Sequence, residues 1–295
     1  MADPRRLKVA VQKSGRLTDP SLELMVRCGL RFSRARDNLV CYGENMPIDL
    51  LLVRDDDIPQ LVADGDCDAG IVGGNVAREF ALAHDSEPFR TARTLDFGSC
   101  RLCLATPVDS GLDTPASLAG KRVATSYPRL TESFLRGIGI DAEVVLLGGA
   151  VEIAPRLGKA DAICDLVSTG QTLRANHLKE IFTVDESRAC LITSPHPLPD
   201  TASTLLERIL MRVDGVLAVN GSKYIMLHAP RAKIAEITRL LPGVEAPTVL
   251  PLDGCTDRVA IHAVCTESVF WETLEALKGA GASAMLVLPV EKMLA

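Results

Sequence analysis

The stretch "DAICDLVSTGQTLRAN", from Asp161 to Asn176, contains a passage from a strand into a helix. Its apolar run from Ala162 to Cys164 is typical of a buried strand, and the carboxylate of Asp165 follows that run directly. Small and hydroxyl-bearing residues come next, and the segment beyond them has the pattern of a helix. Because strands that alternate with helices build sheets with helices packed on them, this stretch predicts an α/β fold.

Two other segments open with the same kind of unit. Residues 7–11, "LKVAV", form an expected strand, followed by a loop and by a helix with Asp19 as its N-cap and Pro20 as its first residue. Residues 122–125, "RVAT", are followed by the loop "SYP" and by a helix that ends near Gly137. Two such openings indicate two α/β lobes of related build.

Further strands and short helices are expected within these lobes. Strands are expected at 48–53, at 68–74, where the strand enters a glycine turn, and at 100–106, 143–147 and 189–193. One short helix is expected to end at Gly65 with Asp57 as its N-cap, and another to run from residue 150 to Gly158. The three prolines in "SPHPLPD" then end the strand at 189–193, where the chain has returned to the first lobe.

The pattern changes from about residue 223. Strand and helix signals then alternate in the order βαββαβ, which is the split-βαβ, ferredoxin-like unit. The segments that carry this order are 223–229, 231–241, 247–252, 258–264, 268–279 and 282–289. A compact module appended to two lobes is expected to be regulatory.

Composition excludes several classes of function. The chain has 295 residues, which is long enough for two or three domains, and a formal charge of −6 with 4% aromatic residues, which argues against nucleic-acid binding. We expect no signal peptide and no membrane association, because no apolar run approaches the roughly 18 residues of a membrane span. The nine cysteines lie singly apart from Cys100 and Cys103, so we expect reduced thiols and a cytoplasmic protein rather than a zinc site.

The loop after Asp165 has the chemistry of a sugar-phosphate site. Backbone N–H groups at the start of a helix bind anions, glycine lets the backbone approach closely, and hydroxyl groups add donors without bulk. An upstream carboxylate repels a phosphate but accepts hydrogen bonds from sugar hydroxyls. We therefore expect a ribose 5-phosphate, with its diol on Asp165 and its phosphate on the turn from Ser168 to Thr172. The alternative is a plain junction in which the hydroxyl groups only cap the helix.

The spacing Asp-x-x-x-Thr-Gly-x-Thr resembles the phosphoribosyl pyrophosphate loop of phosphoribosyltransferases. With "VAVQKSGRL", "RDDDIP", "DAGIVGGNV", "ATSYP", "GAVEIAPRLGKADAICDLVSTGQTL", "KYIMLHAP" and "GAGASAMLVLPVEKM", the whole chain resembles the long form of ATP phosphoribosyltransferase. That family transfers phosphoribosyl from phosphoribosyl pyrophosphate to N-1 of the adenine of ATP, releasing pyrophosphate, as the first step of histidine biosynthesis. The chain departs from the family at Asn75, where an aspartate is common, which argues against a charged role there.

The resemblance implies the substrates ATP and phosphoribosyl pyrophosphate, the cofactor Mg²⁺, the inhibitor histidine, and a homo-oligomer that forms dimers and hexamers. The implied catalytic residues are Glu152, Asp165 and Arg16. Phosphoribosyl pyrophosphate would contact Asp165, Ser168, Thr169, Gly170, Gln171 and Thr172. ATP would contact Lys13, Ser14, Gly15, Arg16, Arg54, Gly73, Asn75 and Tyr127. Histidine would bind near His228, Thr248, Val264 and Ala284, and the metal ligands stay unassigned.

Each of these roles has a plainer alternative. The loop from Lys13 to Arg16 fits a solvated basic loop, Gly73 a turn, and Tyr127 a packing residue. Glu152 fits a favourable charge near the start of a helix. No Ser-His-Asp or HExxH pattern is present, so positioning and charge stabilisation are expected to carry the reaction.

The predicted architecture is α/β, with two periplasmic-binding-protein-like (type II) lobes and a C-terminal ferredoxin-like regulatory domain. The first lobe covers 1–102 with a return segment at about 186–222, the second covers 103–185, and the module covers 223–295. The active site is expected between the lobes. The competing interpretations are a non-catalytic bilobal protein that binds or senses small molecules, and a bilobal transferase or deaminase of another class.

Overall fold

The computed structural model describes residues 5–34, 38–241 and 246–293, and the side chains of 267–270 are not described. The chain divides into two compact units, Met1–Leu210 and Met211–Ala295. Within the described residues, no helix combines the length and the apolar character that a membrane crossing requires.

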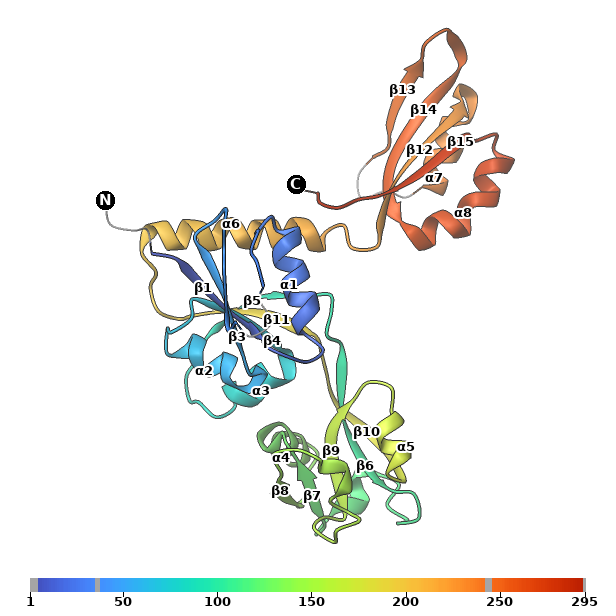
Figure 1. Cartoon of the computed structure of the whole chain (residues 1–295). Helices are drawn as coiled ribbons and strands as arrows, with labels where there is room; N and C mark the ends of the chain where they lie inside the picture. Colours follow the sequence, from blue (N-terminus) through green and yellow to red (C-terminus); the bar gives the residue numbers. More distant parts are fainter. Residues whose placement is uncertain (1–4, 35–37, 242–245, 294–295) are drawn as a thin grey trace. The chain divides into compact units, whose positions relative to one another are not determined.

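The first unit contains two mixed sheets, each with its own helices (Figure 1). The strands of the first sheet are β1 (Leu7–Gln12), β2 (Val40–Tyr42), β3 (Ile48–Val53), β4 (Ala69–Gly73), β5 (Arg90–Thr94) and β11 (Ala189–Thr193). Its helices are α1 (Thr18–Arg27), α2 (Ile58–Ala63) and α3 (Gly74–Ala81). The strands of the second sheet are β6 (Cys100–Pro107), β7 (Arg122–Thr125), β8 (Glu143–Leu146), β9 (Ala162–Val167) and β10 (Leu178–Ser187), with helices α4 (Pro128–Gly137) and α5 (Gln171–Ala175).

The two sheets repeat one topology. In the first, the order is β2-β3-β1-β4-β11-β5, with β1 parallel to β3 and β4 and with β11 antiparallel to β4. In the second, the order β8-β7-β9-β6-β10 places β7 parallel to β8 and β9 and places β6 antiparallel to β9. The chain passes between the sheets twice, from β5 to β6 and from β10 to β11. This double crossing between two sheets of matching order is the type II periplasmic-binding-protein architecture, as predicted.

The apolar runs explain why the central strands are interior. Every residue of β4 is buried, and β3 is buried except at two partly exposed positions, as parallel strands covered on both faces require. The carboxyl ends of β1, β3 and β4 lie at one edge of the first sheet, and those of β7 and β9 lie at one edge of the second. Ligands of α/β proteins bind at these edges.

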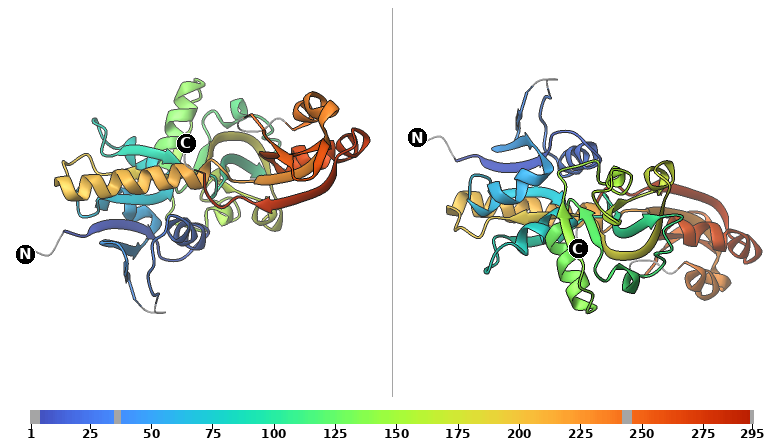
Figure 2. Two further views of the ribbon diagram at one scale, coloured as in Figure 1. Left: turned by 90° about the horizontal axis from the view of Figure 1, so that it is seen from above. Right: turned by 90° about the horizontal axis from the view of Figure 1, so that it is seen from below.

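The second unit begins within α6 (Asp200–Leu217) and continues into a four-stranded antiparallel sheet. Its strands are β12 (Ser222–Pro230), β13 (Thr248–Leu252), β14 (Cys255–Thr266) and β15 (Ser283–Pro289), and its helices are α7 (Ile234–Leu240) and α8 (Glu267–Gly279). The strand order β13-β14-β12-β15 and the βαββαβ sequence confirm the ferredoxin-like fold. Both helices lie on one face of the sheet (Figures 1 and 2) and cover a core that includes Leu227, Ile261 and Leu277. The boundaries predicted for the lobes and the module stay predictions.

Three local predictions are wrong. Helix α1 begins at Thr18, and the Asp19 side chain does not cap it, because the N–H of Leu17 donates to Gln12 Oε1 at 2.9 Å and closes the turn earlier. The expected helix from residue 150 to Gly158 is only a 3₁₀ turn at Val151–Ile153 followed by turns. Pro155 lacks the N–H that a regular helix needs at that point.

The third wrong prediction is the glycine turn after β4. Helix α3 begins directly at Gly74, whose N–H donates to the Arg188 carbonyl at 2.8 Å. A Cβ atom on Gly74 would lie 2.7 Å from that carbonyl oxygen, so this glycine permits a close approach and not a turn. Asp57 does lie at the N-terminal cap of α2, but its side chain makes no capping hydrogen bond.

Candidate functional site

The loop after β9 forms a small cavity with the carboxylates predicted beside it. Gly170 has a φ of +70°, which turns the chain into α5. The cavity has a volume of about 120 Å³. It is lined by Glu152, Asp165, Leu166, Val167, Ser168, Thr169, Gly170, Gln171, Thr172 and Leu173. The structure therefore brings together every residue predicted to hold the phosphoribosyl group.

The donors of this loop are free within the described part of the chain. The hydroxyl groups of Ser168, Thr169 and Thr172 make no hydrogen bond to protein there, and the N–H groups of Thr169 and Gly170 meet no protein acceptor. All three hydroxyl-bearing residues are exposed. Such a set of outward donors is suited to an anion with several oxygens.

Asp165 and Glu152 give one side of the cavity a negative charge. Asp165 Oδ1 accepts the N–H of its neighbour Leu166 at 2.8 Å. Burial raises the pKa of Asp165, the Leu166 hydrogen bond lowers it, and the nearby charge of Glu152 raises it. The two carboxylates are therefore close enough to repel each other, which suits hydroxyl groups or a cation between them.

Arg174 is a residue of this loop that the sequence analysis missed. Its Nη2 donates to the Thr169 carbonyl at 3.2 Å, and its backbone N–H donates to the Gly170 carbonyl at 3.1 Å. Arg174 therefore braces the turn from the α5 side. Arg174 follows Gly170 by four residues, and in a helix this spacing places it one turn above the glycine, so the sequence contained a signal for this contact.

The loop after β1 lies beside the end of β3. The Lys13 N–H donates to the Val53 carbonyl at 2.7 Å, which places this loop next to Arg54. Gly15 has a φ of +133°, and a Cβ atom there would lie 2.8 Å from the Gln12 side chain. The side chains of Lys13, Ser14, Arg16 and Arg54 are exposed, so this edge presents three cations to solvent.

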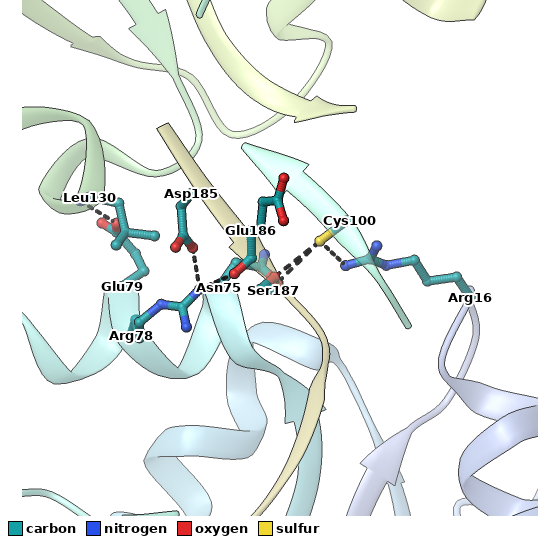
Figure 3. A network of polar contacts seen from close by, with 9 residues as sticks. All are labelled: Arg16, Asn75, Arg78, Glu79, Cys100, Leu130, Asp185, Glu186 and Ser187. Carbon is teal, nitrogen blue, oxygen red and sulfur yellow. Dashed lines mark hydrogen bonds and ion pairs between the residues drawn. The ribbon is translucent and has the colours of Figure 1, made fainter. Parts of the chain in front are cut away.

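Arg16 reaches from this loop to the point where the strands cross between lobes (Figure 3). Its Nη2 lies 3.0 Å from Cys100 Sγ, which lies 3.2 Å from Ser187 Oγ. Asn75 Oδ1 accepts from Ser187 Oγ at 3.2 Å, and Asn75 is only 1% exposed. Asn75 is thus buried where the strands cross between the lobes, and its side-chain oxygen accepts a hydrogen bond from Ser187.

A larger cavity of about 750 Å³ lies beside the crossing strands. Arg78, Arg101 and Arg188 line it, and Ser168 lines both cavities. Most of the predicted substrate contacts lie outside this larger cavity.

Tyr127 connects the two lobes. It packs against the apolar core of the first lobe, which includes Ile58, and against an apolar core of the second, which includes Val123. Burial raises the pKa of Tyr127, the charges of Asp56, Asp55 and Asp165 raise it further, and Arg16 lowers it. Groups from both lobes therefore lie around this phenol.

The backbone of α4 is also held across the lobes. The Glu79 carboxylate, on α3, accepts the N–H of Arg129 at 2.9 Å and the N–H of Leu130 at 2.8 Å. These are first-turn amides that have no partner inside their own helix. Figure 3 shows the contact with Leu130. Glu79 is a second contact that the sequence did not indicate.

In the C-terminal unit, three of the four residues predicted to bind histidine share one face of the sheet. The three residues are His228 of β12, Thr248 of β13 and Val264 of β14. Val264 pairs with Tyr224, which lies four residues before His228 and therefore on the same face as it. Thr248 pairs with His262, which lies two residues before Val264 and therefore also on that face. That face is opposite the one covered by α7 and α8, whose core contains Ile225 and Leu227. Ala284 lies where β15 slips in register against β12, with a φ of +49°.

The bilobal fold and the donor-rich loop beside paired carboxylates are suited to a protein that binds a sugar phosphate. The model of the family "ATP phosphoribosyltransferase" (HisG) matches residues 54–215, and that of "HisG, C-terminal domain" matches residues 220–292. The chain belongs to the ATP phosphoribosyltransferase family. It is therefore an enzyme that transfers phosphoribosyl to ATP and opens histidine biosynthesis, and the non-catalytic interpretation is not favoured.

One similar solved structure carries the same family name. A chain of the ATP phosphoribosyl transferase (HisG:HisZ) complex from Thermotoga maritima is 26% identical, with a TM-score of 0.57, and the match covers 70% of this chain and 98% of that one. The periplasmic aliphatic sulphonate-binding protein SsuA from Escherichia coli is 15% identical, with a TM-score of 0.48 and coverage of 72% and 73%.

Proposed function

We propose that the turn from Ser168 to Thr172 holds the 5-phosphate of phosphoribosyl pyrophosphate, and that Asp165 accepts its ribose hydroxyls. The observation that carries this assignment is the single cavity formed by Glu152, Asp165 and this turn. The free N–H and hydroxyl donors support it, since a phosphate dianion needs several donors at once.

ATP is proposed to bind on the first lobe, at the loop after β1. The exposed cations Lys13, Arg16 and Arg54 suit its triphosphate, and Ser14 and Gly15 belong to the same loop. Gly73 ends β4 at the same edge, and Tyr127 covers that edge from the second lobe. Asn75 is buried, so its proposed role is to support this pocket at the crossing.

The reaction needs little covalent chemistry from the protein. As the bond from C-1 to pyrophosphate breaks, positive charge develops on the ribose, and N-1 of adenine must be in line with C-1. Positioning by the two lobes and exclusion of water on closure would supply most of the acceleration. Asp165 and Glu152 are proposed to stabilise the cationic sugar by their charge, and Arg16 is proposed to stabilise the leaving group.

Enzymes of this family use a divalent metal, and we propose Mg²⁺ here. The described residues contain no cluster of three or more metal-binding side chains. The pair Glu152 and Asp165 nevertheless fits, because Mg²⁺ is often held by one or two carboxylates with substrate phosphates and water. When bound, the ion would neutralise the charge of pyrophosphate, while the loop would orient the sugar.

The loop assignment is tested by the double variant Thr169→Val and Thr172→Val. We expect its affinity for phosphoribosyl pyrophosphate, measured by calorimetry, to fall by at least tenfold, because two hydroxyl donors are lost. The control is Thr114→Val, at an exposed position away from the cavity. Unchanged affinity in the double variant would mean that the 5-phosphate binds elsewhere.

Regulation and assembly are also proposed. We expect histidine to inhibit through the C-terminal unit near His228, Thr248, Val264 and Ala284, and the chain to form homo-oligomers, as dimers and hexamers, in the cytoplasm. Support comes from the separate fold of this unit and from its own family match. The Thermotoga relative is part of a complex, which is consistent with assembly of this chain.

A further inference from the structure

Asp55 is a partly buried carboxylate that follows Arg54 at the end of β3. Its Oδ1 is buried and has no hydrogen-bond partner in the described structure. The backbone of Gly73, at the end of β4, lies beside the other oxygen, since a Cβ atom on Gly73 would lie 3.7 Å from Asp55 Oδ2, and its N–H lowers the pKa of the carboxyl group. The carboxylate is thus held from one side and lacks a donor on the other.

The charged and titratable neighbours of Asp55 come from four parts of the fold. Asp56 repels its charge, and Arg16, from the loop after β1, attracts it. The charge of Asp55 in turn acts on Tyr127, from the second lobe, and on Cys190 of β11. These neighbours place Asp55 at the sheet edge where Arg16 and Tyr127 meet.

An unpartnered buried carboxylate oxygen is costly, so its presence at a ligand-binding edge indicates a donor supplied by a ligand. Adenine has one hydrogen-bond donor on its base, the exocyclic amino group, next to N-1. A phosphate group fits less well here, because the negative charge of Asp56 beside Asp55 repels an anion.

We propose that Asp55 is a catalytic residue that accepts a proton from the exocyclic amino group of adenine as N-1 is phosphoribosylated. This inference rests on the proposed function. The lone pair of N-1 forms a bond to C-1 of the ribose, and the bond from C-1 to pyrophosphate breaks with its electron pair on pyrophosphate. The resulting adeninium cation loses its amino proton to Asp55, which later releases it to solvent.

The protonation behaviour of the carboxyl is consistent with this role. Burial, together with the charge of Asp56, raises the pKa of Asp55 from 3.8 to about 6, against the lowering effects of Arg16 and the Gly73 N–H. A carboxylate of this kind is ionised at neutral pH and is still a better proton acceptor than an ordinary aspartate. Protonation of Asp55 at low pH should therefore remove the proton acceptor, and the reaction rate should fall on the acidic side of the pH profile.

The test is Asp55→Asn, compared with Asp56→Asn, whose side chain is exposed. We expect Asp55→Asn to lower kcat by about 100-fold, within the usual range for a general base. We also expect it to abolish the fall of kcat/KM below about pH 6, while calorimetry shows unchanged affinity for phosphoribosyl pyrophosphate. Asp56→Asn should keep kcat at pH 8 and move the acidic limb to lower pH, because a repelling charge is removed.

The outcomes separate this inference from the function on which it rests. A kcat within threefold of the wild type, or an acidic limb that persists in Asp55→Asn, overturns the role of Asp55. Weaker ATP binding with unchanged kcat overturns it too, because Asp55 would then only bind. Absence of transfer by the wild-type enzyme, or unchanged affinity after the paired threonine replacements, would count instead against the proposed function.

Discussion

Replacing Glu79 with glutamine removes the charge that holds the first turn of α4 across the lobes. The carboxylate is 14% exposed and accepts two backbone N–H groups, from Arg129 and Leu130, at 2.9 and 2.8 Å. The amide that replaces it has a single oxygen, so one of the two N–H groups loses its acceptor.

The size of the effect follows from these contacts. A hydrogen bond to a charged group contributes about 1.5–3 kcal/mol, and a negative charge at a helix N-terminus contributes about 0.3–1 kcal/mol. The Arg129 guanidinium lies 3.8 Å from Glu79 and is half exposed, so it adds little. We expect Glu79→Gln to weaken the contact between residue 79 and the first turn of α4 by about 2 kcal/mol. This loss corresponds to a change of roughly 30-fold in the equilibrium between the formed and the open contact.

Amide hydrogen exchange measures this contact directly. Amides in the first turn of a helix have no acceptor within it, so protection at Arg129 and Leu130 would report Glu79 alone. We expect Glu79→Gln to speed exchange there by roughly 30-fold, and the control Glu132→Gln, at an exposed position of α4, to leave it unchanged. Solvent-like exchange of both amides in the wild type would refute the contact.

Other predictions concern the loop, the buried carboxylate and the C-terminal unit. Gly170→Val should lower both stability, by about 1–2 kcal/mol, and affinity for phosphoribosyl pyrophosphate, because φ is +70° there. Gly111→Val, at a similar φ of +69° with open space around it, should lower stability in urea unfolding but not affinity. The pKa of Asp55 is raised to about 6, so its neutral form stabilises the fold below about pH 4, and this contribution is lost as pH rises through 6. Asp55→Asn should therefore raise the free energy of unfolding at pH 8 by about 3 kcal/mol, and an unchanged value would contradict the burial of that charge. Deletion after residue 222 should abolish inhibition by histidine, and persistent inhibition would exclude the C-terminal unit as the regulatory site.

The sequence was sufficient where a local pattern determined the outcome. The apolar runs at 48–53 and 189–193 became strands, and the βαββαβ order became the ferredoxin-like sheet. The residues around Gly170 are neighbours in sequence, so a local sequence motif was enough to predict that they line one cavity. The helix predicted to end at Gly158 does not form, because Pro155 lies inside it and has no backbone N–H to donate.

The remaining features depend on contacts between distant residues. Glu79 meets Leu130 across 51 positions, and Cys100 meets Ser187 across 87. Nothing in "RDDDIP" distinguishes Asp55 from Asp56, since only the fold covers one and exposes the other. Burial and pairing across lobes are properties of the tertiary structure, and a single sequence does not reveal them.

The double crossing has a consequence for synthesis on the ribosome. Among the described strands, β5 pairs only with β11, and all strands of the second sheet lie between these two in the chain. The second lobe can therefore fold while the first still lacks a strand, for roughly 5–20 s at usual rates of translation. During that interval the newly made first lobe exposes an open sheet edge. An open edge can pair with strands of other chains, so the partly made protein is prone to aggregation at this stage and is a target for chaperones.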